Sequence, residues 1–185
     1  MKKLIIINGD IATGKTHLAH IIKDRFSLLL FTKDEYKESL ADIYPYSTYE
    51  ESHRLSIMAF DMLFAAFEKV ASTNASDLIL EGNFREEHMN KLQSIINKYG
   101  YDVLHLDLVG SPKVLYERYI NRRDNENRHP VHAVNNLNDF NSFNGYTIAR
   151  QSQKKIGKVI TINADTFDYQ RDESLFKTID EFLNK

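Results

Sequence analysis

Eight residues near the N-terminus, Gly-Asp-Ile-Ala-Thr-Gly-Lys-Thr at positions 9–16, have the types and spacing needed to bind phosphate. They match the pattern G-x-x-x-x-G-K-[ST], whose backbone turns tightly around an anion and presents successive N–H groups to it. We expect Lys15 to contact the β- and γ-phosphates of a nucleotide and the Thr16 hydroxyl to ligate Mg²⁺. The pattern therefore predicts that the chain binds a nucleoside triphosphate.

The segments on either side of this loop match the setting of a functional site. The apolar run Leu4–Ile7 precedes the loop, and apolar residues at 18, 19, 21 and 22 follow at the spacing of one helix face. A glycine-rich turn with a solvated lysine is the alternative, but strand, loop and helix together favour nucleotide binding. The residues assigned to the nucleotide are Gly9, Asp10, Ile11, Ala12, Thr13, Gly14, Lys15, Thr16 and His17.

An acidic residue lies at or near the end of each of the next three predicted strands, where ligands bind in α/β sheets. Asp34 falls in the first turn of the following helix. A carboxylate there can orient an acceptor hydroxyl or accept its proton, as phosphoryl transfer requires. A carboxylate that only complements the helix dipole is the alternative for Asp34.

Glu81 and Asp107 compete for the role of a Walker-B-type carboxylate. Glu81 directly follows the apolar run 78–80 and could hold Mg²⁺ through water or act on the acceptor. Asp107 has a similar prefix, but Leu108 and Val109 follow it and indicate that the strand continues. We favour Glu81, and its alternative is an ion pair with Arg85.

Arginines precede and enter a polar, asparagine-rich stretch at 121–147. A long polar stretch inside a domain is usually functional, so we predict a mobile, partly helical lid over the triphosphate. Arg118 and Arg122 share one helix face, and Arg123 and Arg128 follow. Converging arginines would neutralise charge on the transferred phosphoryl group, and we assign this role to Arg118, Arg122 and Arg128. A solvated basic helix end is the alternative.

Apolar runs alternate with helical patterns along the chain. Strands are predicted at 4–7, 28–31, 78–80, 103–106 and 159–162, and the main helices after the phosphate loop near 55–70, 86–98, 112–123 and 175–183. Such alternation predicts a parallel α/β sheet with helices on both faces. The length of 185 residues fits a single domain over residues 1–185.

The composition is that of a soluble globular protein and excludes several classes of function. The chain has no cysteine, so disulfides and thiolate catalysis are excluded, and its net charge of −2 gives no footprint for duplex nucleic acid. The pair His129 and His132 lacks further ligands at metal spacing. No signal-peptide pattern or membrane-length apolar run is present, which predicts a cytoplasmic protein.

The chain resembles the P-loop kinases described as AAA-type ATP-binding or zeta-toxin-like small kinases, within the P-loop NTPase superfamily. The resemblance rests on GDIATGKT at 9–16, FTKDEYKESL at 31–40, LILEGNFREE at 78–87 and YERYINRRDNENRHP at 116–130. It implies a three-layer sandwich with a five-stranded parallel sheet in the order 2-3-1-4-5, an ATP·Mg²⁺ donor and an arginine-bearing lid. Asp10 and Ile11 depart from the small residues or proline of relatives, and an acidic Asp10 fits only if it points away.

The resemblance also implies an acceptor site. The residues that match Asp34, Glu81 and Asn83 are expected to face the acceptor, and Arg54 is expected to add a contact from the stretch that shapes the pocket. The leading hypothesis is an ATP-dependent kinase that phosphorylates a hydroxyl of a small molecule. A 5′-hydroxyl polynucleotide kinase and a nucleotide-dependent ATPase switch are the alternatives; the acidic net charge disfavours the first.

Overall fold

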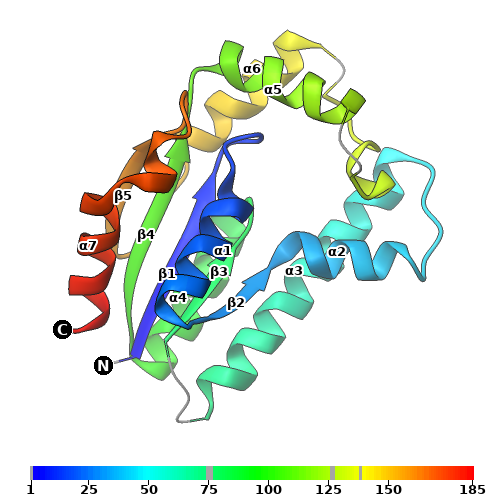
Figure 1. Cartoon of the computed structure of the whole chain (residues 1–185). Coiled ribbons are helices and arrows are strands. Elements are labelled where there is room, and N and C mark those ends of the chain that lie inside the picture. The colour runs from blue at the N-terminus through cyan, green and yellow to red at the C-terminus, as the bar shows by residue number, and fades with distance from the viewer. Residues whose placement is uncertain (1, 74–76, 126–127, 138) are drawn as a thin grey trace.

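A parallel sheet of five strands forms the centre of the described chain (Figure 1). The computed structural model describes residues 2–73, 77–125, 128–137 and 139–185. The spatial order is β2-β3-β1-β4-β5, so the predicted order 2-3-1-4-5 is confirmed. The strands are β1 (Lys2–Gly9), β2 (Leu29–Thr32), β3 (Leu78–Glu81), β4 (Tyr101–Val109) and β5 (Lys158–Asn163).

Seven α-helices in the described residues cover the sheet and the edge at which the strands end (Figure 1). None of them is long and apolar enough to cross a membrane. They are α1 (Lys15–Phe26), α2 (Lys33–Ala41), α3 (Tyr49–Ala71), α4 (Glu86–Tyr99), α5 (Pro112–Asn125), α6 (Phe140–Gln151) and α7 (Glu173–Leu183), with 3₁₀ turns η1 (Pro130–His132) and η2 (Asp168–Arg171).

Alternate strand residues bury the two faces of the sheet, because successive side chains of a strand point to opposite sides. Leu4 and Ile6 of β1 pack with apolar side chains of α3 and α4. Ile5 and Ile7 pack on the other face with α1 and α7. Both faces of β1 are therefore covered, which explains why its sequence is a continuous apolar run. The result is the predicted three-layer sandwich.

The register of the strands brings distant residues to one edge. Ile7 of β1 lies beside Glu81 of β3, and Asn8 lies beside Asp107 of β4. The Asn8 side chain also fixes the turn after β3, because its Oδ1 accepts hydrogen bonds from the N–H groups of Gly9 and Phe84. The phosphate loop and the turn after Glu81 are thus held together at the carboxyl ends of the strands.

The segment 121–147 is more regular than the sequence predicts. Its described part contains the end of α5, the turn η1 and the start of α6. Apolar side chains of α5 and α6 pack with Leu137 and with Ala12 of the phosphate loop. Because these apolar residues are far apart in the sequence, the helical pattern of this segment is hard to recognise from the sequence. Residues 126, 127 and 138 of the predicted lid lie outside the described residues. Its mobility stays a prediction.

Candidate active site

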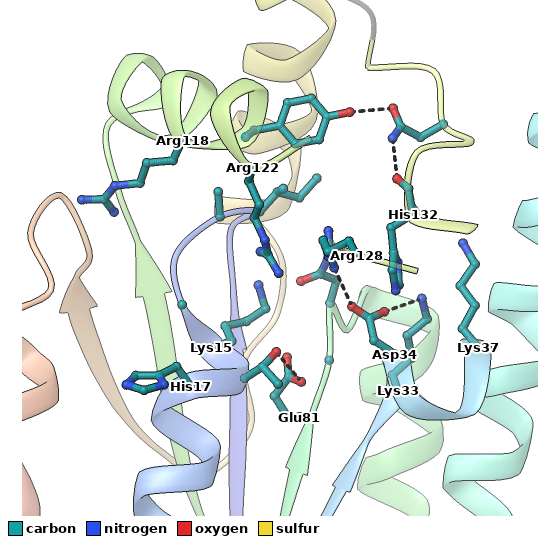
Figure 2. Close-up of a pocket in the computed structure, with 18 of the residues that line it drawn as sticks. Lys15, His17, Lys33, Asp34, Lys37, Glu81, Arg118, Arg122, Arg128 and His132 are labelled. Carbon is teal, nitrogen blue, oxygen red and sulfur yellow. Dashed lines mark hydrogen bonds and ion pairs between the residues drawn. The ribbon is translucent and has the colours of Figure 1, made fainter. Parts of the chain in front are cut away.

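A cavity of about 620 Å³ opens at the carboxyl edge of the sheet, within the size range of small-molecule sites. The phosphate loop forms its floor, α2 and the turn after β3 form one side, and α5 and the segment after it form the roof (Figure 2). Phe167 and Gln170, from the segment after β5, line the other side. The sequence-predicted segments at 9–16, 31–40, 78–87 and 116–130 therefore meet around one space.

The phosphate loop has the backbone conformation of an anion-binding turn. Ala12 and Gly14 have left-handed φ angles of 62° and 80°, which turn the chain sharply at two points. A Cβ atom at Gly14 would lie 2.6 Å from the Tyr169 hydroxyl oxygen, so close packing also demands glycine there. Gly14 caps α1, whose first residues are Lys15 and Thr16. The N-terminus of α1 therefore faces the cavity, where it favours negative charge.

Six of the nine residues assigned to the nucleotide line the cavity: Ile11, Ala12, Gly14, Lys15, Thr16 and His17. Gly9, Asp10 and Thr13 do not. Thr13 donates its hydroxyl to the Asp10 carbonyl oxygen at 2.8 Å and shapes the loop. A Cβ atom at Gly9 would lie 2.4 Å from the Leu108 carbonyl oxygen, so Gly9 is required for the approach of the loop to β4.

The Asp10 side chain points away from the cavity into a buried ionic network, so its assignment to the nucleotide is corrected. It accepts hydrogen bonds from Arg150 Nε and from Gln151 Nε2. Arg150 also donates to Asp107 at 2.7 Å, and Lys155 lies 3.3 Å from the same carboxylate. We call Asp10, Asp107, Arg150 and Lys155 the loop anchor. It ties the phosphate loop to β4 and α6.

The contacts of the loop anchor also distinguish between the two candidates for the Walker-B-type carboxylate, Glu81 and Asp107. Asp107 lies within β4, is buried, contacts the cations Arg150 and Lys155 and does not line the cavity. Glu81 does line the cavity and accepts a hydrogen bond from the Thr16 hydroxyl at 3.2 Å. Its alternative partner Arg85 instead lies over the Tyr146 ring. The geometry therefore favours Glu81.

Lys15 and Glu81 face the same space and affect each other's charge. Burial raises the pKa of the Glu81 carboxyl to about 7, against the opposing effect of Lys15. Burial likewise lowers the pKa of Lys15 to about 8. The Lys15 ammonium donates a hydrogen bond to the Asp10 carbonyl oxygen at 2.7 Å. An incoming anion at this point would favour the charged lysine.

Asp34 lies on the opposite side of the cavity, in the first turn of α2, among cations (Figure 2). Its carboxylate lies 3.1 Å from Lys33 Nζ and 3.6 Å from a terminal nitrogen of Arg128. Burial alone would raise the pKa of Asp34, but Lys33, His132 and Arg128 together hold it well below its usual range. Asp34 is therefore ionised and suited to orienting a hydroxyl.

Three basic residues on this side, Lys33, Lys37 and His132, were not assigned from the sequence. Lys37 is buried and donates to the Ser52 hydroxyl at 2.9 Å, and Ser52 in turn donates to the Val131 carbonyl oxygen. His132 lies 2.7 Å from Glu38. Both Lys37 and His132 line the cavity. We call the residues of this side the α2 cluster: Lys33, Asp34, Lys37, Arg128 and His132.

The predicted arginines fall in different places. Arg122 lines the cavity and points towards the side of Lys15 (Figure 2), as its predicted role requires. Arg118 also lines the cavity, but its guanidinium donates to the carbonyl oxygens of Ala164 and Asp165 and lies 4.2 Å from the Phe167 ring centroid. The position of Arg118 beside an aromatic ring fits contact with the nucleobase of a nucleotide better than contact with the transferred phosphoryl group.

The two remaining predicted acceptor contacts differ from each other. Arg54 is exposed on α3 and does not line the cavity, so its assignment is not supported. Its neighbour Leu55 takes the buried position on that helix. Asn83 lines the cavity, and its buried Oδ1 has no hydrogen-bond partner in the described chain. A buried oxygen without a partner is costly, which favours a ligand group that donates to Asn83.

Comparisons with known proteins agree with this geometry. A family model described as an AAA domain matches residues 4–140. A solved structure from Chloroflexus aurantiacus, provisionally assigned as a kinase, is 26% identical with a TM-score of 0.84, and the match covers 98% of each chain. A sugar kinase from a Janibacter species is 16% identical with a TM-score of 0.60, over 97% of this chain and 95% of the other.

A gluconokinase from Sinorhizobium meliloti is 10% identical with a TM-score of 0.59, over 99% of this chain and 94% of the other. At these low identities the sugar kinase and the gluconokinase show a shared fold. No match was found among curated proteins.

Proposed function

Because the chain belongs to the AAA domain family, which matches residues 4–140, we propose that it is an ATP-dependent kinase. The acceptor group is a hydroxyl of a small molecule. The Chloroflexus aurantiacus structure provisionally assigned as a kinase supports this class of activity, and the two distant kinase structures share its fold. The narrower zeta-toxin-like assignment stays a prediction, because it concerns the acceptor.

One observation carries the proposal: the phosphate loop and the α2 cluster line the same cavity. Lys15, Thr16 and Glu81 lie on the donor side, and Asp34 lies on the opposite side (Figure 2). A protein that only hydrolyses ATP would not need a second charged wall facing the phosphates. A kinase needs one, because it must hold an acceptor hydroxyl in line with the γ-phosphorus.

The proposed reaction is a single in-line transfer. The acceptor oxygen bonds to the γ-phosphorus while the bond from that phosphorus to the β–γ bridging oxygen breaks, which gives ADP and a phosphate ester. The ionised Asp34 orients the acceptor hydroxyl and receives its proton late in the step, before the proton passes to water. Lys15 and Arg122 stabilise the charge on the donor phosphates and the transferred group.

The residues near Thr16 fit Mg²⁺. The Thr16 hydroxyl and the Glu81 carboxylate are hard oxygen donors that lie 3.2 Å apart beside the phosphate loop. Mg²⁺ commonly takes one or two protein ligands and completes its shell with phosphate oxygens and water. Thr16 and Glu81 would hold the ion, which would supply charge neutralisation at the donor phosphates.

ADP formation measured with different acceptors tests the proposal. The acceptor panels are neutral sugars, nucleosides, antibiotics, small hydroxy acids and 5′-hydroxyl oligonucleotides. We expect one panel to stimulate ADP formation strongly and Lys15→Ala to reduce the rate by about a hundredfold or more. Stimulation by oligonucleotides alone would favour a polynucleotide kinase. Absence of stimulation by every panel would contradict the kinase and favour an ATPase switch.

A further inference from the structure

The α2 cluster carries more positive than negative charge. Lys33, Lys37 and Arg128 are cations that line the cavity, and Asp34 is the carboxylate among them. Lys33 and Arg128 both contact Asp34, so this carboxylate is shared between two cations. Glu38 adds a second carboxylate behind His132. The contacts of the described residues leave Lys37 without a carboxylate.

Lys37 is the buried cation of the cluster. Its residue is 7% exposed, and the ammonium group has a hydroxyl oxygen, Ser52 Oγ, as its hydrogen-bond partner. No carboxylate lies within 4 Å of it among the described residues. Burial, with smaller effects of Lys33 and Arg128, lowers the pKa of Lys37 to about 8, against the opposing effect of the more distant Asp34 carboxylate. The protein therefore tolerates an unfavourable charge at this position.

A structural role explains this arrangement poorly. A buried ion is costly unless it is paired, and a neutral side chain could pack between α2 and α3 without that cost. Lys15 and the N-terminus of α1 lie at the proposed donor site, so the donor phosphates would not require Lys37 as a partner. In Figure 2, Lys37 lies beyond Asp34 and His132 from Lys15. Its position corresponds to the part of an acceptor farthest from the γ-phosphate.

We propose that the α2 cluster is a binding subsite for an acidic group of the acceptor, with Lys37 as its central contact. This inference rests on the proposed kinase function. The acceptor is accordingly a small molecule with both a hydroxyl and an anionic group, either a carboxylate or a phosphate. The hydroxyl lies at Asp34, and the anionic group lies one helical turn further along α2, near Lys37. The subsite excludes neutral sugars and nucleosides from efficient transfer.

Anion binding measured with the donor side filled tests the subsite. The protein is saturated with Mg²⁺ and a non-hydrolysable ATP analogue, and inorganic phosphate or acetate is added at constant ionic strength. Lysine side-chain NMR follows the pKa of Lys37, which rises when an anion binds beside it. The anion that binds with the higher affinity, phosphate or acetate, identifies the acidic group of the acceptor as a phosphate or a carboxylate.

Three variants make the test specific. We expect Lys37→Met to bind the preferred anion about tenfold or more weakly, the loss of one charge-assisted contact, while Lys37→Arg retains binding. Lys91→Met is the matched control, because Lys91 is an exposed lysine paired with Asp61 on another face of the chain. Its affinity for the anion stays at the wild-type value. Equal binding by wild type and Lys37→Met, or no binding of either anion to the wild type, would overturn the subsite.

Different results would contradict the anion subsite and the proposed kinase activity. Rapid transfer to a neutral acceptor, with the same kcat/KM in Lys37→Met, would overturn the subsite and leave the kinase intact. Lys37-dependent anion binding without transfer to any acceptor would overturn the kinase and leave the anion subsite intact.

Discussion

The loop anchor and the α2 cluster are both built from charged residues near the phosphate loop, but they differ in balance. In the loop anchor, Asp10 and Asp107 meet Arg150 and Lys155, so two negative charges face two positive ones. Both carboxylates and the guanidinium are almost fully buried. In the α2 cluster, cations outnumber carboxylates, and the side chains border an open cavity.

This difference is expected if the loop anchor stabilises the fold and the α2 cluster binds a ligand, as proposed. A buried network can stabilise a structure only when each ion is paired within the protein. An unbalanced cluster at a cavity lowers stability and is favoured where a ligand supplies the missing charge. The loop anchor ties the phosphate loop to β4 and α6, and the α2 cluster is the proposed binding site for the acidic group of the acceptor.

The largest expected effect is on catalysis, from Asp34→Asn. The amide keeps the shape of the side chain but cannot orient and deprotonate the acceptor hydroxyl in the same way. We expect kcat to fall about a hundred- to ten-thousandfold, while ATP affinity is retained. Stability changes by up to about 1 kcal/mol, the contribution of a carboxylate to the helix dipole. A destabilised but fully active variant would mean that Asp34 only stabilises the fold, and Glu81 would become the first candidate for the residue that acts on the acceptor.

The next effect is on stability, from Arg150→Met. This change leaves Asp10 and Asp107 buried without their main cation, so the free energy of unfolding should fall by about 3–5 kcal/mol. Denaturant titration measures the change. The matched control is Arg25→Met, which breaks an exposed pair with Glu173 and should change the free energy of unfolding far less, because exposed ion pairs contribute little. Equal losses in both variants would mean that the loop anchor does not stabilise the fold.

The smallest effect is that of Lys37→Met, and it has the opposite sign. Removing an unpaired buried cation should leave the free energy of unfolding unchanged or raise it by about 1 kcal/mol near neutral pH. Burial lowers the pKa of Lys37 to about 8 in the folded chain, from 10.5. The unfolded chain therefore holds the proton more tightly, and the penalty on folding is complete below pH 8.

The pH dependence of this difference can be measured. As the pH rises from about 8 to about 10.5, folded Lys37 loses its proton while the unfolded chain keeps it, so wild-type stability increases relative to Lys37→Met. The gap between the two proteins should narrow over this window. A wild type that is several kcal/mol more stable at pH 7 would make Lys37 a structural residue like Arg150.

Local sequence patterns predicted the strands, and the family resemblance predicted their order. Local patterns also predicted the residues that line the cavity near the phosphate loop. The phosphate loop, Lys15, Thr16 and Glu81 could be found because each follows directly from a short motif or an apolar run. The loop anchor could not be found, because Asp10 and Arg150 are 140 residues apart. The hydrogen-bond partner of Lys37, Ser52, also comes from a separate helix, α3.

Asp10 and Arg54 were assigned to the site but do not line the cavity, for two different reasons. Asp10 lies within a binding motif, yet its side chain is directed by Arg150 of a distant helix. Arg54 lies next to the buried Leu55, and a rotation of one residue along a helix places it in solvent. Lys33 and Lys37 share a helix face at a spacing of four, which is the signal that could have indicated the α2 cluster.

The fate of the γ-phosphoryl group tests the central claim most directly. Phosphorus NMR of a reaction with ATP, Mg²⁺ and the acceptor selected by ADP formation distinguishes a phosphate ester from inorganic phosphate. We predict that wild type forms the ester on an acceptor that also carries an acidic group, that Asp34→Asn forms little of it, and that Lys15→Ala forms neither product at an appreciable rate. Inorganic phosphate as the sole product from wild type would contradict the account.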